Sequence, residues 1–77
     1  MKNAVIRLST ISDVKKFVTI ANSRTYDIDL LSGRYVIDAK SIMGIFSLDL
    51  SQPITIQADC NDNDSFFEEI KDFIVKK

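Results

Sequence analysis

The sequence predicts an α+β protein of two layers, in which three helices cover one face of a four-stranded antiparallel sheet. Two segments, 26–30 and 54–58, alternate apolar and polar residues, as strands with one solvent-exposed face do. Two others, 14–21 and 66–74, place apolar residues at helical spacing. The resulting order is βαββαβα, and so few strands can pack with three helices only if the helices gather on one side. Residues 1–77 are short enough to form a single domain.

The first strand and the first helix are read from residues 4–21. Residues 4–8 form an apolar, β-branched run, which predicts a strand with Ile6 and Leu8 on one face. Ser12 is the expected N-cap of the helix, and Asp13 lies in its first turn, where the helix dipole favours a carboxylate. The buried face is expected to hold the residues at i, i+3, i+4 and i+7, namely Val14, Phe17, Val18 and Ala21.

Residues 26–39 are predicted to form a β-hairpin. Ser32-Gly33 supplies the turn, because glycine adopts a positive φ without steric cost. The returning strand, 34–39, is expected to turn Tyr35, Ile37 and Ala39 toward the core.

A short helix is predicted over residues 41–48, with Ser41 as its N-cap. Ile45 and Leu48 share one face of it and are expected in the core. Gly44 lies inside this helix, where glycine costs about 1 kcal/mol relative to alanine. A close approach to another element would explain its presence.

A fourth strand and a last helix complete the predicted fold. Pro53 marks the entry to the strand 54–58. Residues 62–65 offer capping side chains, and Ser65 with Glu68 also matches a capping box. The apolar face of the last helix is expected to consist of Phe66, Phe67, Ile70, Phe73 and Ile74.

The charge balance excludes several classes of protein. Ten basic and 11 acidic residues give a net charge of −1, which argues against binding of nucleic acid or of a membrane through a basic patch. No stretch approaches the ~20 apolar residues of a membrane span, and the first residues do not resemble a signal peptide, so membrane insertion is not expected. The single cysteine, Cys60, cannot form an internal disulfide, which favours a reducing, cytoplasmic setting.

Composition also limits the chemistry. The sequence contains no histidine, which excludes histidine acid–base catalysis, histidine metal ligation and phosphohistidine formation. Asp59, Asn61 and Asn63 match the start of a calcium-binding loop, but Asp64 stands where that loop needs glycine and Ile70 where it needs glutamate. Neither a metal site nor a cofactor is expected.

Two strings resemble a known family. Lys40–Leu48, KSIMGIFSL, resembles the regulatory-serine segment of the HPr family, the histidine-containing phosphocarrier proteins of the bacterial sugar phosphotransferase system. Residues 54–59, ITIQAD, are similar to that family's fourth strand. The resemblance extends over residues 4–75. It implies the HPr-like open-faced β-sandwich and a protein that acts on protein partners rather than as an enzyme.

The loop after the first strand departs from the family. There the family carries a Gly-x-His-Ala-Arg-Pro motif, whose histidine receives phosphate from Enzyme I and passes it to sugar-specific transporter components. The matching loop here is degenerate, with neither the histidine nor the arginine or proline, and reads Ser9, Thr10, Ile11, Ser12 and Asp13. Asp13 also places a carboxylate where an anion would bind. The resemblance therefore implies a member without the active-site histidine and without phosphocarrier activity.

Ser41 matches the serine that a dedicated ATP-dependent kinase phosphorylates in many family members, whose phosphorylated form is the corepressor of a transcription factor. By this resemblance Ser41 is a candidate regulatory phosphorylation site. The adjacent Lys40, Ile42, Met43 and Phe46 form a candidate partner-binding patch. The implied partners are a serine kinase, a transcription repressor or a component of the transport system.

Plainer interpretations of these residues stay open. Ser41 could serve only as an N-cap, and Phe46 could fold onto the sheet as part of the core. The chain would then be a degenerate phosphocarrier paralogue that is not phosphorylated and acts only as a protein-interaction domain. Separately, Asp27, Asp29 and the acidic loop 59–64 could select a basic partner.

Overall fold

A computed structural model describes residues 2–61 and 64–75 of the chain. Within these residues it contains a four-stranded sheet with the order β1-β4-β2-β3, in which every neighbouring pair is antiparallel. The elements in chain order are β1 (Lys2–Ile6), α1 (Ile11–Asn22), β2 (Ile28–Ser32), β3 (Tyr35–Asp38), α2 (Ile42–Phe46), β4 (Ile54–Ala58), α3 (Phe66–Glu69) and a 3-10 helix, η1 (Lys71–Phe73). The predicted fold class and element order are confirmed.

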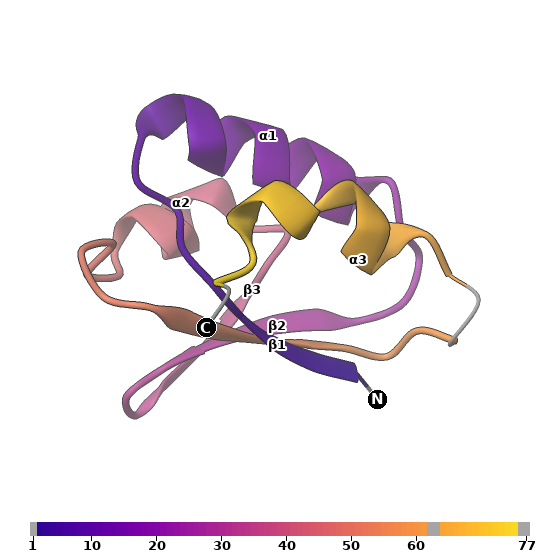
Figure 1. Ribbon diagram of the computed structural model, residues 1–77. Coiled ribbons are helices and arrows are strands. Elements are labelled where there is room, and N and C mark those ends of the chain that lie inside the picture. The colour runs from indigo at the N-terminus through magenta and orange to yellow at the C-terminus, as the bar shows by residue number, and fades with distance from the viewer. Residues whose placement is uncertain (1, 62–63, 76–77) are drawn as a thin grey trace.

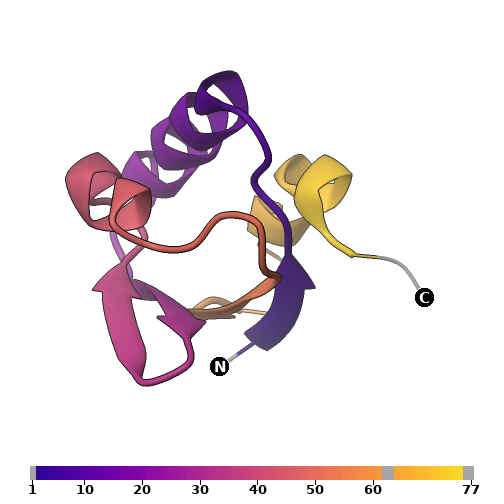
Figure 2. The same cartoon turned by 90° about the vertical axis from the view of Figure 1, so that its left-hand side faces the viewer.

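The three helices lie on one side of the sheet, and no helix or strand of residues 2–61 and 64–75 covers the opposite face (Figure 1). The turned view shows the same two layers, with α1 and α2 over one part of the sheet and α3 over the other (Figure 2). This arrangement buries the sheet face that the alternating segments predicted to be apolar. Ile28, Leu30, Ile54 and Ile56 are fully or almost fully buried there.

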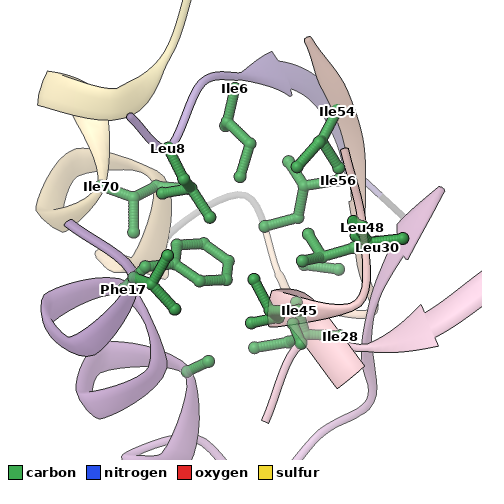
Figure 3. Packing of buried hydrophobic residues seen from close by; sticks show 14 of the residues in the cluster. Ile6, Leu8, Phe17, Ile28, Leu30, Ile45, Leu48, Ile54, Ile56 and Ile70 are labelled. Carbon is green, nitrogen blue, oxygen red and sulfur yellow. The ribbon is translucent and has the colours of Figure 1, made fainter. Parts of the chain in front are cut away.

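The core lies between the sheet and the helices (Figure 3). Ile6 and Leu8 are buried as expected, as are Ile45 and Leu48 of the segment around α2. From α1, Val14, Phe17 and Ala21 are buried while Val18 is only half-buried. None of the described polar or charged residues is buried, so this core is made by apolar packing alone.

The hairpin has a two-residue loop between Ser32 and Tyr35, which are paired. Gly33 takes the first loop position with φ = 59°, the backbone conformation that favours glycine. Ile37 and Ala39 turn toward the core as predicted. The prediction that Tyr35 is a core residue is wrong: it shares their sheet face, but it stands beside the turn, beyond the cover of the helices, and is exposed.

The N-cap of α1 is Thr10, not Ser12 as predicted. Thr10 has an extended backbone, and its Oγ1 accepts from the N–H of Asp13 at 3.0 Å. The Asp13 carboxylate accepts in return from the N–H of Thr10 at 3.3 Å, which completes a capping box. Asp13 therefore acts as the third residue of the box, and Ser12 lies inside the helix.

The C-terminal segment contains less helix than predicted. α3 ends at Glu69, η1 follows, and Ile74 is extended and forms a bridge with Ile6. The cause is the free outer edge of β1, where the N–H of Val75 donates to the carbonyl of Val5 at 2.8 Å. This pairing gives hydrogen-bond partners to backbone groups on the outer edge of β1. If the helix continued, those groups would face solvent, and the edge strand would stay uncovered.

The predicted cap of α3 also differs in detail. The Ser65–Glu68 capping box does not form; Ser65 Oγ donates instead to Glu69 Oε2 at 2.9 Å. The capping acceptor is Asp64, whose Oδ1 accepts from the N–H of Phe66 at 2.8 Å. Asp62 and Asn63, which were also expected to cap this helix, lie outside the described residues.

Arg24, just after α1, ties that helix to α3. Its guanidinium forms an ion pair with Glu69, and its Nε lies 3.4 Å from Asp64 Oδ1. The same group lies 5.8 Å from the ring centroid of Phe66, within cation–π range. The Arg24 side chain is only 18% exposed. Sequence periodicity could not reveal the ion pairs of Arg24, because Asp64 and Glu69 are distant in sequence and follow no periodic rule with it.

Candidate functional site

The short helix α2 presents the candidate regulatory serine at its N-terminus. Ser41 has an extended backbone, and its Oγ accepts from the N–H of Gly44 at 3.3 Å, so it is the N-cap that the sequence predicted. The residue is exposed. Its hydroxyl thus has a structural role, and its position leaves it accessible to an enzyme.

Packing fixes the orientation of α2. Ile45 is fully buried beneath the helix. Gly44 faces β3, where Ile37 leaves no space for a larger side chain. Because these two residues face the sheet, the other three residues of α2, Ile42, Met43 and Phe46, lie on its sides or on its solvent-facing surface.

Two large apolar side chains of α2 are exposed to solvent. Met43 is 77% exposed and Phe46 is 40% exposed, and neither belongs to the core cluster. Ile42 differs from them, because it is half-buried and packs against the core. The candidate patch thus has two outward members, Met43 and Phe46, and a partly covered one, Ile42. Exposed apolar residues of this size are typical of docking surfaces.

Lys40 lies beside Ser41 but its side chain is engaged elsewhere. The Nζ of Lys40 donates to the backbone carbonyl of Tyr26 at 2.9 Å, and the residue is half-buried. The Lys40 N–H donates to Asp38 Oδ1 at 2.9 Å. These bonds hold the segment that leads into α2 against the start of β2. The role of Lys40 in partner binding stays a prediction.

Residues 9–13 lead into α1 and form its first turn. The Asp13 carboxylate already bonds the backbone N–H groups there. Asp13 Oδ2 accepts from the N–H of Ser9 at 3.1 Å and from that of Thr10 at 3.3 Å. Two backbone donors that an anion could use are therefore already bonded. Ile11 is exposed at the first helical position.

A hollow of about 440 Å³ adjoins this loop, between the start of α1 and the C-terminal segment. Arg7 and Lys16 line it together with Asp13 and Asp72, so its charges are balanced. The Arg7 guanidinium donates to the carbonyl of Ser51 at 2.9 Å. Among the described residues no group of three or more histidine, cysteine, aspartate or glutamate side chains could hold a metal ion. Nor is any helix within the described ranges long and apolar enough to cross a membrane.

Most titratable groups with displaced pKa values gather between α1 and α3; the exception, Asp49, follows α2, and a hydrogen bond from the Ser51 hydroxyl lowers its pKa. The Arg24 guanidinium holds the pKa of Glu69 below its usual range. The pKa of Asp64 is lowered by the N–H that Phe66 donates to it. Burial raises the pKa of Tyr26. All three belong to the contact between α1 and α3, which makes this a structural network.

Solved structures with the same fold include phosphocarrier proteins. HPr-C-His from Thermoanaerobacter tengcongensis is 26% identical, with a TM-score of 0.77 over 94% of this chain and 89% of that one. The phosphocarrier protein HPr from Bacillus anthracis str. Ames is 25% identical, with a TM-score of 0.71 over 96% of both chains. A Mycoplasma histidine-containing phosphocarrier protein is 26% identical, with a TM-score of 0.69 over 92% of this chain and 86% of that one.

The comparison with curated proteins gives no match. A family model does match, over residues 13–76, and its description is "PTS HPr component phosphorylation site". The match covers most of the chain and includes α2 with Ser41. The family is one of phosphocarrier proteins rather than enzymes, and its members interact with other proteins of the phosphotransferase system. The chain belongs to the HPr family of the phosphotransferase system.

Proposed function

We propose that this chain is a regulatory binding module of the phosphotransferase system, controlled at Ser41 and without histidine phosphocarrier activity. The observation that carries the proposal is the pairing of an exposed Ser41 with the exposed Met43 and Phe46 on one short helix. A phosphorylated serine there changes the charge of the surface that a partner would contact. The proposed setting is the cytoplasm.

The absence of histidine from the sequence supports the second half of the proposal. Phosphohistidine is a high-energy donor, and a serine or threonine ester does not replace it. The Asp13 carboxylate adds a second obstacle, since it bonds the N–H groups of Ser9 and Thr10 and would repel a phosphate.

The energetics at α2 are compatible with modification. A phosphate adds roughly 1.5 to 2 negative charges and acceptor oxygens beside the first turn of a helix, where they are tolerated or favourable. The Ser41 Oγ accepts from the Gly44 N–H at 3.3 Å, a long bond whose loss costs little. Modification of Ser41 is therefore expected to leave α2 folded.

The test is phosphorylation by ATP and an HPr serine kinase, followed by peptide mapping. We expect wild type to be modified at Ser41 and Ser41→Ala to stay unmodified. The double variant Met43→Ser/Phe46→Ser keeps Ser41 and removes the two large apolar side chains that α2 exposes, so slower modification of this variant, with its fold retained, would assign Met43 and Phe46 to kinase docking. If wild type stays unmodified while an authentic HPr is modified in the same tube, Ser41 is an N-cap only. The chain is then the alternative, an interaction domain without phosphorylation.

A further inference from the structure

The face of the sheet opposite the helices carries an ordered chemical pattern. By strand register, Val5 lies opposite Thr55, Thr55 opposite Leu31, and Leu31 opposite Val36. These four residues, three of them apolar and one a threonine, form one row across all four strands, here called the apolar row. Val5 is 43% and Val36 is 62% exposed, and none of the row belongs to the core cluster. No helix or strand in the described part of the chain covers it (Figure 1).

The neighbouring row is acidic on β2 and β3 and carries neutral amides on β1 and β4; it is called the acidic row here. Asn3 lies opposite Gln57, Gln57 opposite Asp29, and Asp29 opposite Asp38. Successive outward residues of a strand are about 7 Å apart, so this acidic row runs parallel to the apolar row at that distance. Asp27 and Asp59 follow beyond it; the Asp59 N–H donates to the Asp27 carbonyl at 3.0 Å, which places these two side by side.

Asp29 and Asp38 directly oppose each other across β2 and β3. Like charges in this position destabilise a sheet. No lysine or arginine occupies any of the outward positions of the described strands to compensate them. Lys40 follows Asp38, but its ammonium group is bonded to the Tyr26 carbonyl. Asp38 has a structural role, because its Oδ1 accepts from the N–H of Lys40 at 2.9 Å, but that bond leaves the repulsion from Asp29 in place. A cation supplied from outside would relieve this repulsion.

We propose that this open face docks an amphipathic helix of another protein, with lysine or arginine along one border of its apolar stripe. The apolar row crosses four strands, about 14 Å, which equals roughly three turns of such a stripe. A helix laid along the row has a radius of about 5 Å, so basic side chains on one border reach the acidic row at about 7 Å. A second copy of this chain fits less well, because its own open face brings carboxylates and no basic residue from the strands.

The proposal concerns a different face from α2, so it stands or falls independently of Ser41. The probes are two synthetic amphipathic peptides of about 18 residues, long enough to form helices. They share one apolar stripe, which is bordered by lysine in one and by glutamate in the other. Amide shifts of the ¹⁵N-labelled chain are followed during titration with each peptide.

We expect saturable shifts on β1–β4 with the lysine peptide, weakened by salt, and none with the glutamate peptide. Asp29→Asn/Asp38→Asn should weaken this binding roughly fivefold, and Val36→Ser should weaken it as well. Glu68→Gln is the matched control, because it removes an exposed carboxylate from the helical side and should leave binding unchanged.

Three results would overturn the proposal. Shifts at α2 instead of the sheet would move the docking surface to Met43 and Phe46. An equal loss in Glu68→Gln and in Asp29→Asn/Asp38→Asn would reduce the binding to general charge attraction. Self-association of the chain through the same strands, detected as concentration-dependent shifts without peptide, would make a second copy the occupant.

Discussion

Gly44 and Ile37 approach so closely that a Cβ atom on Gly44 would lie 2.7 Å from Cγ2 of Ile37. This contact sets α2 against β3 and explains a glycine at a position where alanine would favour the helix. The atom in the way is a branch methyl near the backbone, which moves less easily than the end of a long side chain. The packing of α2 against β3 thus requires a residue without a side chain at position 44.

Gly44→Ala should lower the free energy of unfolding by about 1 kcal/mol, since overpacking outweighs the gain in helix propensity. Urea denaturation measures this difference. The control is the same change in an Ile37→Ala background, where the methyl is gone and alanine at position 44 should be neutral or stabilising. An equal loss in both backgrounds would show that the contact with Ile37 is not the cause.

Thr10→Ala should lower the free energy of unfolding by about 1 kcal/mol, because it removes the N-cap acceptor of α1. Ser12→Ala is the matched change two residues later, inside the helix, and should fall within about 0.5 kcal/mol of wild type. Thermal or urea unfolding of both variants checks this. A larger effect for Ser12→Ala would place the cap where the sequence pattern suggested it.

Arg24→Ala should lower the free energy of unfolding by about 1–2 kcal/mol, since it removes two ion-pair contacts and a cation–π contact between α1 and α3. Lys71→Ala removes an exposed pair with Glu68 and should cost less than about 0.5 kcal/mol. Comparable losses in the two variants would contradict a special role for Arg24.

Acid should weaken the same contact. The pKa of Glu69 is lowered in the folded state, first by its hydrogen bond from Arg24, so the folded state binds fewer protons than the unfolded state near that pKa. The stability that this ionisation contributes is present above the ordinary glutamate value of about 4.3 and is lost as pH falls through the folded value. Urea midpoints measured from pH 6 down to about pH 3 should therefore decline less in Glu69→Gln than in wild type. Parallel curves would contradict this contribution.

Removing one of the two facing carboxylates on the open face of the sheet should stabilise the fold. Asp29→Asn should raise the free energy of unfolding by about 0.5 kcal/mol, because it relieves the repulsion from Asp38 across the strands. High salt should shrink the difference, since the repulsion is screened. Asp29→Asn less stable than wild type would mean that the folded state benefits from this carboxylate after all.

The sequence could predict what depends on local periodicity. Alternation placed Ile28 and Leu30 on the buried face, and the i, i+3 spacing placed Ile45 and Leu48 in the core. Serine before an apolar run located the start of α2 at Ser41.

What the sequence could not predict depends on tertiary surroundings. Tyr35 has the parity of a core residue, but the helices do not extend over the turn that it adjoins. Ile74 has helical spacing with Ile70, yet the free edge of β1 draws it into a bridge with Ile6. For the candidate site, pattern named Met43 and Phe46 but could not give their exposure, because that depends on how Gly44 seats the helix. Arg24 was missed because its partners are distant in sequence.

The most direct test of the central claim compares two routes of phosphorylation on one preparation of the full chain. Intact mass is recorded after incubation with ATP and an HPr serine kinase, and separately with phosphoenolpyruvate and Enzyme I, with an authentic HPr beside it in each reaction. We expect one phosphate from the kinase, absent in Ser41→Ala, and none from Enzyme I. Transfer of phosphate from Enzyme I to this chain, or equal modification of Ser41→Ala by the kinase, would contradict the account.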